Sequence, residues 1–305
     1  MKLTQQNLIE LSKVAQEAAL KAGEVIETVI LDAPSRENLK VKSKATGSSK
    51  ASQVVTEVDL KCEKIILDVI EPTLKKFDLA LLSEESIDDQ SRFEKDYFWC
   101  IDPLDGTLAF VESKPGFSVS IALVSKDGVP QIGVVYDPST QTLYSAVKGN
   151  RAFKNNQPLQ QIKHQSGSKR KQNILTVIAE PNLIMSAEFA KIIDELKQIS
   201  NSYSWSEMKI LEGYGAVINA CQVIENSPAV YFKLPKPQQG GGSIWDFAAT
   251  CCLFNELTGV VSDVFGIQLD LNKKGDSFMN LGGVIYASEK SISTEMIRII
   301  QGILK

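Results

Sequence analysis

The sequence of 305 residues contains a single histidine, His164. It lies in a polar stretch, KHQSGSKRK, that we interpret as a surface connection. Ser-His-Asp and Cys-His catalysis, and metal sites with histidine ligands, would all depend on this one side chain. The scarcity of histidine therefore favours chemistry carried out by carboxylates.

Cysteine is scarce as well, with five residues and no Cys-x-x-Cys pair. An odd count without ligand spacing argues against a disulfide framework and against a zinc site. Most of these cysteines lie in apolar or helical contexts, where a free thiol behaves as a small hydrophobic group. We therefore expect a reducing, cytoplasmic location. The five residues are Cys62, Cys100, Cys221, Cys251 and Cys252.

Long apolar runs and an excess of basic charge are also missing. No stretch approaches the roughly 18 uninterrupted apolar residues of a transmembrane helix, and the N-terminus lacks the pattern of a secretory signal. The net charge is −4, which argues against a protein that binds nucleic acid through its phosphates. We expect neither a membrane segment nor a nucleic-acid partner, and we interpret the short basic run 169–171 as a solvated face.

The composition is otherwise that of a globular protein, with 43% hydrophobic and 23% charged residues. The length predicts two structural units. Apolar periodicity predicts a helix over 4–30 and a second helix over 56–76 that ends near Pro72, separated by a polar, flexible loop over 42–53. Short apolar runs between 79 and 147 predict an antiparallel meander.

Residues 163–172 are the best candidate for a boundary between two halves. We expect an N-terminal α+β half over 1–162 and a C-terminal α/β half over 173–305. The second half mixes strands and helices. Strands are predicted over 173–179, 229–233, 260–264 and 283–287, and helices over 186–199, 213–225, 245–257 and 289–304.

The most informative segment is WCIDPLDGT, residues 99–107. A hydrophobic strand ends there, and Pro103 fixes the backbone between two aspartates so that both carboxylates can converge. Gly106 and Thr107 open the next segment, where free backbone N–H groups can face an anion. Carboxylates with such donors describe a site where a hard cation such as Mg²⁺ holds a phosphate. The alternative is a pair of ordinary turn dipeptides, Asp-Pro and Asp-Gly.

Three other carboxylate positions bear on that choice. Glu84-Glu85 follows a short apolar strand, Asp59 opens the second helix, and Asp246 stands at a helix start after three glycines. Each has a plain structural explanation. The glutamates can be a solvated acid pair, and the two aspartates can complete capping boxes that begin at Thr56 and Ser243.

Taken together, the series D … EE … DPLDGT … WD … G resembles the inositol monophosphatase superfamily of lithium-sensitive, magnesium-dependent phosphatases. The resemblance runs from about Val55 to Ala287 and includes the phrases SVSIALV and GVVYDP. It implies a layered αβαβα sandwich, the sugar-phosphatase fold, with the active site between the two halves. Two departures stand out. Thr258-Gly259 replaces the usual pair of glycines, and KLPKPQQGGGSI is not the usual substrate-contacting sequence of inositol phosphatases.

The resemblance also implies roles by position. Two or three Mg²⁺ ions would clamp the phosphate and lower the pKa of a bound water. Thr107 and Asp59 would activate the attacking water, and the backbone N–H groups of Gly106 and Thr107 would hold the phosphate. Glu85 would lie beside the ligands. The implied metal ligands are Glu84, Asp102, the Leu104 carbonyl, Asp105 and Asp246.

Within the superfamily, the phrases FWCIDPLDGTLAFVESKPGFSVSIALV and IGVVYDP look most like bacterial-type 3'(2'),5'-bisphosphate nucleotidases. Those remove the 3'-phosphate of 3'-phosphoadenosine 5'-phosphate. They often carry lysine and glutamate after the DGT, where this chain has Leu108-Ala109. An inositol-1-phosphate phosphatase shares the same core and is the alternative. Fructose 1,6-bisphosphatase is a more distant relative.

A functional hypothesis of a different class is that the protein is a non-catalytic family member, which senses nucleotide or serves as a scaffold. Each implied ligand position and Thr107 keep a competent residue, which favours the enzyme. The expected partner is a small-molecule phosphate ester. Members of the superfamily are frequently dimers, which leaves a homodimer open.

Overall fold

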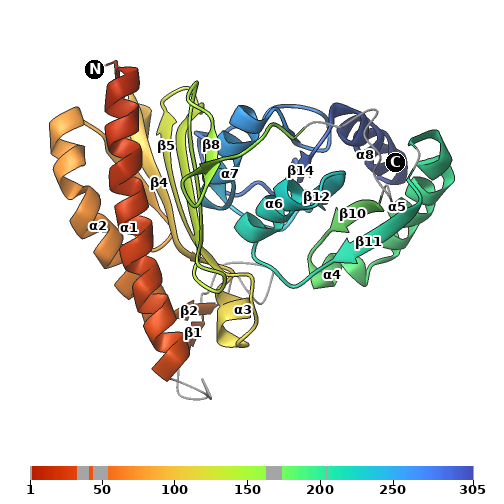
Figure 1. Ribbon diagram of the computed structural model, residues 1–305, viewed down its shortest axis with the longest axis horizontal. Coiled ribbons are helices and arrows are strands. Elements are labelled where there is room, and N and C mark those ends of the chain that lie inside the picture. The colour runs from red at the N-terminus through yellow and green to blue at the C-terminus, as the bar shows by residue number, and fades with distance from the viewer. Residues whose placement is uncertain (1, 33–40, 44–53, 163–173, 204, 305) are drawn as a thin grey trace.

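Layers of helix and sheet alternate through the molecule in the order α-β-α-β-α (Figure 1). The structure is a computed structural model that describes residues 2–32, 41–43, 54–162, 174–203 and 205–304. The layered sandwich predicted from the sequence is confirmed. The proposed boundary at 163–172, His164 and the basic run 169–171 lie outside the described residues.

Helices α1 (Gln5–Asp32) and α2 (Glu57–Phe77) form the first layer and cover the outer face of a seven-stranded sheet (Figure 1). Their apolar stripes, with Leu11 and Ile66 fully buried, pack on that face. The expected loop between these helices is flanked by two short antiparallel strands, β1 (Val41–Ser43) and β2 (Val54–Thr56). Residues 44–53 of that loop lie outside the described part of the chain.

The second helix was predicted over 56–76 and spans Glu57–Phe77, but the expectation that it ends near Pro72 was wrong. Proline removes one backbone donor from a helix. The helix nevertheless keeps its buried face, since Thr73 and Phe77 are both buried. The Thr73 hydroxyl also donates to the Ile70 carbonyl at 2.6 Å and accepts from Trp99 Nε1 at 2.9 Å. Burial and these side-chain bonds outweigh the missing backbone bond.

The seven-stranded sheet has its strands in chain order, and neighbouring strands are antiparallel from β4 onward. The meander prediction was wrong for the first pair, because β3 lies parallel to β4. Parallel pairing puts the carboxyl ends of both strands at the same edge, which brings Glu84 beside the DPLDGT segment. The strands are β3 (Ala80–Ser83), β4 (Tyr97–Asp105), β5 (Ser118–Ser125), β6 (Pro130–Asp137), β7 (Thr142–Val147), β8 (Ala152–Lys154) and β9 (Gln157–Pro158).

The second sheet is mixed and has the strand order β11-β10-β12-β14-β13. Strand β11 was not expected from the sequence, and it pairs in parallel with β10. The strands are β10 (Ile174–Ile178), β11 (Glu207–Leu211), β12 (Ala229–Lys233), β13 (Val260–Ser262) and β14 (Val284–Ala287).

Helices α6 (Ala216–Glu225) and α7 (Ile244–Leu257) lie between the two sheets, and α5 (Ala187–Ile199) and α8 (Lys290–Ile303) cover the far face (Figure 1). Helix α7 is apolar on nearly all sides, as a helix buried between two sheets must be. One apolar cluster contains residues of both sheets and of this middle layer. The two halves therefore share a core where they meet.

Two sequence-based expectations concern the chain as a whole. All five cysteines, each within the described residues, are buried and free. Across the ranges that the structure describes, none of the helices combines the length and the apolar character that a membrane span needs.

Candidate active site

Strand β4 positions the two aspartates of the DPLDGT segment. We expected the strand to end before the two aspartates. It instead runs through Asp102 to Asp105. Its pairing with β5 is irregular between these residues, which is the mark of a β-bulge. A bulge re-aims the side chains that follow it. The Leu104 N–H donates to Asp102 Oδ1 at 3.0 Å and holds the first carboxylate over the turn.

Asp246 approaches the same point from the first turn of α7. One of its oxygens, Oδ2, accepts the backbone N–H of Ser243 at 2.6 Å, so the expected capping interaction is present. A carboxylate has several acceptor sites, so capping leaves this group free to bind a cation as well. The capping and ligand roles are compatible at Asp246.

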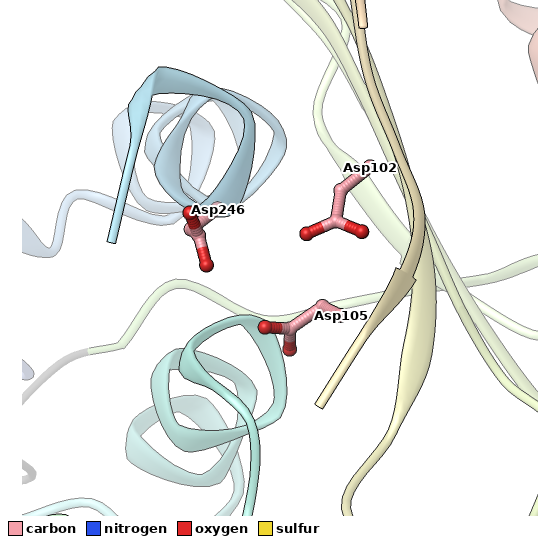
Figure 2. A group of neighbouring side chains, drawn as sticks. All are labelled: Asp102, Asp105 and Asp246. Atoms are coloured by element: carbon pink, nitrogen blue, oxygen red, sulfur yellow. The ribbon is translucent and has the colours of Figure 1, made fainter. Parts of the chain in front are cut away.

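The carboxylates of Asp102, Asp105 and Asp246 form one cluster, with an oxygen from each lying within 4.8 Å of the others. Figure 2 shows the three groups facing one another between β4 and the ends of two helices. Asp102 and Asp105 are buried and Asp246 is half-buried. Oxygen donors of this kind and charge are those that Mg²⁺ and other hard divalent cations prefer. The donor set therefore fits the expected metal.

The electrostatics of the cluster also fit a cation. Burial raises the pKa of Asp102 well above its usual range, and the charges of Glu84 and Asp105 raise it further. Burial and the charge of Asp246 raise the pKa of Asp105 in the same way. Several carboxylates this close cannot all ionise without countercharge. A divalent cation would supply that countercharge.

The start of helix α6 supports Asp105 from the opposite side. The Ala216 N–H donates to Asp105 Oδ1 at 3.1 Å, and the Val217 N–H donates to Oδ2 at 2.9 Å. These donors lie in the first turn of a helix, where the dipole favours negative charge. The sequence predicted this helix but carried no signal that its N-terminus contacts a residue more than 100 positions earlier.

Asp59 and Thr107, the predicted water-activating pair, are in contact. Thr107 Oγ1 lies 3.2 Å from Asp59 Oδ1, although 48 residues separate them, and both side chains are buried. The same hydroxyl lies 3.0 Å from the Leu104 carbonyl, which the family resemblance implies as a metal ligand. A hydroxyl has one proton, so it donates to only one of these two acceptors at a time.

Gly106 joins β4 to the short helix α3 (Thr107–Val111). It adopts a φ of 79°, and a Cβ there would lie 2.6 Å from the Gly116 carbonyl oxygen. Only glycine fits such a position. Thr107 is the first residue of α3, and N–H groups in the first turn of a helix lack intrahelical acceptors. The predicted phosphate donors thus lie next to the acidic cluster in the chain.

Glu84 and Glu85 follow the end of β3 and are both half-buried. The Glu84 N–H donates to the Ile101 carbonyl at 3.1 Å, which ties this loop to the residue before Asp102. The charge of Glu84 raises the pKa of Asp102, but Glu84 is not among the three acids whose oxygens lie within 4.8 Å of one another. Ser86 donates to Glu63 of α2 at 2.8 Å and holds the loop from outside.

Lys233, at the end of β12, is a residue of this region that the sequence analysis missed. Its ammonium pairs with Glu180 Oε1 at 2.5 Å, and its side chain is 11% exposed. Burial alone would lower the pKa of Lys233, but Glu180 and nearby Asp246 raise it well above the usual value. Lys233 in turn partly offsets the raised pKa values of Asp105 and Asp246. A lysine that closes the apolar run AVYFK was the available signal.

Comparisons with known proteins agree with this geometry. Residues 7–304 match the inositol monophosphatase family. The chain is 28% identical over 264 residues to an inositol-1-monophosphatase of Bacillus subtilis, covering 85% of this chain and 88% of that protein. It is 30% identical over 295 residues to the Nus factor SuhB of Haemophilus influenzae, covering 94% of each.

A solved structure leads to the same family. The extragenic suppressor protein SuhB of Bartonella henselae superimposes with a TM-score of 0.69 at 25% identity, over 96% of this chain and 98% of that one. The agreement spans both sheets and the helices between them, so it covers the elements that carry the acidic cluster. The chain belongs to the inositol monophosphatase family, a family of phosphatases.

Proposed function

We propose that this chain removes the 3'-phosphate of 3'-phosphoadenosine 5'-phosphate in a magnesium-dependent reaction. The observation that carries the choice of substrate is Lys233, a largely buried lysine near Asp246 that pairs with the more exposed Glu180. Burial, and then the charge of Lys233, lowers the pKa of a second lysine, Lys236. Lys233, near Asp246, and the neighbouring Lys236 suit a substrate that carries a second phosphate.

Glycines on the approach to α7 support this arrangement of lysines. A Cβ on Gly241 would lie 2.8 Å from Lys236 Cε, and one on Gly242 would lie 3.4 Å from Lys233 Nζ and 2.6 Å from the ring of Phe247. Both glycines also have positive φ angles. Gly241 and Gly242 thus leave room for the two lysine side chains on the approach to α7. This segment is also the one that departs from the usual inositol phosphatase sequence.

The acidic cluster, with Glu84 and the Leu104 carbonyl, would hold Mg²⁺ ions. When bound, Mg²⁺ supplies positive charge that stabilises the phosphate and the leaving oxygen. The Thr107 hydroxyl accepts a hydrogen bond from the attacking water and donates one to Asp59. These two bonds orient the water. The backbone N–H groups of Gly106 and Thr107 donate to the phosphate oxygens. Direct attack by water requires no covalent phospho-enzyme.

The second candidate function is hydrolysis of inositol 1-phosphate. The names of the relatives from Bacillus subtilis and other organisms favour it. An inositol monophosphate carries one phosphate and neutral hydroxyl groups, so it leaves the two lysines without an anionic partner in the substrate. This difference separates the two candidates by experiment.

The test is release of phosphate from 3'-phosphoadenosine 5'-phosphate, inositol 1-phosphate, fructose 1,6-bisphosphate and 5'-AMP, with Mg²⁺ and with EDTA. We expect the highest kcat/KM for 3'-phosphoadenosine 5'-phosphate, no turnover of 5'-AMP and none in EDTA. Lys233→Met should lower kcat/KM for the bisphosphate about tenfold more than for inositol 1-phosphate, the loss of one charge-assisted contact. A preference of the wild type for inositol 1-phosphate would establish the second candidate instead.

A further inference from the structure

Arg92 is a buried cation that the proposed reaction does not use. It is 2% exposed and lies in the segment that follows Glu84-Glu85. Its Nε donates to Asp88 Oδ2 at 2.8 Å. Its two terminal nitrogens cross to the other half of the chain, where they donate to Asn272 Oδ1 at 2.5 Å and to the Lys273 carbonyl at 3.2 Å. Burying a guanidinium is costly unless it is hydrogen-bonded, and here each of its three nitrogens has an acceptor.

Asn272 also donates a hydrogen bond back to Arg92. Its Nδ2 donates to the Arg92 carbonyl at 3.2 Å and to the Lys126 carbonyl at 2.8 Å, and the residue is 8% exposed. Arg92 and Asn272 therefore bind each other reciprocally across a separation of 180 residues. The planar fork of arginine makes three bonds in fixed directions, which a lysine at this position could not reproduce.

From Asn272, the bridging segment (residues 270–280) leads to the start of α7. The Ile244 N–H donates to the Ser277 carbonyl at 2.9 Å, and the Met279 N–H donates to the Gly242 carbonyl at 2.9 Å. These bonds hold both sides of Ser243, which caps the turn that carries Asp246. Within the segment, Lys273 Nζ bonds to the Phe278 carbonyl and forms an ion pair with Asp276. The connection from Arg92 to the first turn of α7 is thus made of short, directed bonds.

On the other side, Arg92 lies at the end of the loop that begins with Glu84. The first residue of that loop is tied to β4 through the Ile101 carbonyl, and Asp88 within it holds the Arg92 guanidinium. One network therefore joins the loop that carries Glu84 to the helix that carries Asp246. These two acids come from different halves of the chain.

We propose that Arg92 is a positioning residue that keeps the Glu84 loop and the start of α7 at the separation a divalent cation requires. The inference rests on the proposed metal site. Arg92 contacts neither metal nor substrate, and it acts through Asn272 and the bridging segment. Its loss should weaken the binding of Mg²⁺ and leave the chemistry of the loaded enzyme nearly intact.

The test measures the Mg²⁺ concentration for half-maximal activity in Arg92→Lys and Asn272→Ala, with calorimetric titration of Mg²⁺ as a second readout that needs no turnover. We expect half-saturation to rise about tenfold in each variant, the lower end of the range for groups that orient metal ligands. At saturating Mg²⁺, kcat should stay within about threefold of wild type. The double variant should be little worse than either single one, because the two residues act as a unit.

Ile300→Val is the matched control, since it truncates a fully buried side chain in the core beneath α8 and leaves the network untouched. It should lower the melting temperature without moving the Mg²⁺ half-saturation. Folded Arg92→Lys with wild-type half-saturation would overturn the inference. If Arg92→Lys does not fold, Asn272→Ala decides alone, because it removes no charge. Failure of the wild type to bind Mg²⁺ would instead refute the proposed function.

Discussion

At the scale of single residues, the Thr107 hydroxyl is the group on which the proposed chemistry depends most. It stands within bonding distance of Asp59 and of the Leu104 carbonyl, but it has one proton to give. Donation to either acceptor leaves its oxygen lone pairs available to a water. The group can therefore orient a nucleophile whichever acceptor it uses, and only donation to Asp59 couples it to a carboxylate.

Thr107→Ala should lower kcat by about 10²–10⁴, the usual contribution of one acid–base partner. KM should change little, because the backbone N–H that faces the phosphate remains. Steady-state kinetics with 3'-phosphoadenosine 5'-phosphate measure both. Thr107→Ser keeps the hydroxyl and serves as the control, with kcat expected near wild type.

If the Thr107 hydroxyl has only a structural role, the alanine variant should lose about 1 kcal/mol of stability with its hydrogen bond and keep a normal kcat. Asp59→Asn extends the test. It should lose as much rate as Thr107→Ala, and the double variant should be little slower than either single one, since the two groups act together. Independent, multiplying losses would place the base elsewhere.

Asp102→Asn tests the repulsion within the acidic cluster. The substitution keeps the oxygen that accepts the Leu104 N–H but removes a charge from the carboxylate whose pKa is raised by Glu84, Asp105 and Asp246. Without metal, the variant should melt at the same temperature as wild type or higher. Its stabilisation by Mg²⁺ should be smaller, because ligand binding stabilises by mass action. An equal Mg²⁺ shift in both proteins would show that Asp102 is not a ligand.

At the scale of elements, the turn from β4 into α3 determines where the cluster and the phosphate donors meet. The β-bulge turns Asp105 toward α6, and the next residue, Gly106, turns the chain back with a positive φ. The start of α6 then clamps Asp105 with two N–H groups. A strand end, a bulge and two helix starts thus meet at one point, although the start of α6 lies 111 residues beyond Asp105 in the chain.

Gly106→Ala should disrupt this convergence. The added methyl would meet the Gly116 carbonyl oxygen at 2.6 Å, a backbone atom that cannot move aside without shifting β5. Gly149→Ala is a matched control, since its φ of 74° is nearly the same and nothing lies within 4 Å of its Cβ. The control should lose only the cost of the backbone conformation, about 1 kcal/mol. Thermal melting should show a larger loss of stability in Gly106→Ala than in the control. Only Gly106→Ala should also lose activity, measured as kcat.

At the scale of the whole molecule, the acidic cluster lies where the layers meet. Asp102 and Asp105 belong to the seven-stranded sheet, and Asp246 belongs to the helical layer between the sheets. A cation bound there would link the two halves of the chain. Its binding should therefore stabilise the entire fold and not one loop.

The raised carboxylate pKa values predict how stability depends on pH. In a window that begins near the ordinary aspartate pKa of about 4 and extends up to the raised values, the folded state without metal binds more protons than the unfolded chain. Stability contributed by these protonated groups is therefore lost as pH rises through that window. Bound Mg²⁺ should offset the loss, so the Mg²⁺-induced rise in melting temperature should grow with pH.

Melting curves from pH 4 to 8, in EDTA and in saturating Mg²⁺, measure this dependence. Asp102→Asn provides the control, because it has one acid fewer to ionise and should show a shallower decline in EDTA. Parallel pH profiles with and without Mg²⁺ would contradict the coupling between the cluster and the metal.

Features that depend on neighbours within a few residues could be predicted from the sequence. The helical stripes of α1 and α2 follow from apolar spacing, and the closeness of Asp102, Asp105, Gly106 and Thr107 follows from one nine-residue segment. The capping turn at Asp246 could be predicted for the same reason, because its partner Ser243 is three residues away. Local backbone geometry governs all of these.

Partners that are distant in the chain could not be predicted, because the packing of the layers brings them together. Asp105 meets the start of α6, Thr107 meets Asp59, and Arg92 meets Asn272, although each pair is separated by at least 48 residues. The parallel pairing of β3 and the passage of α2 through Pro72 were decided in the same way. Local patterns specify which face of an element is apolar, but the packing of whole layers selects which faces meet. The acidic cluster forms at the line where that packing brings β4, α6 and α7 together.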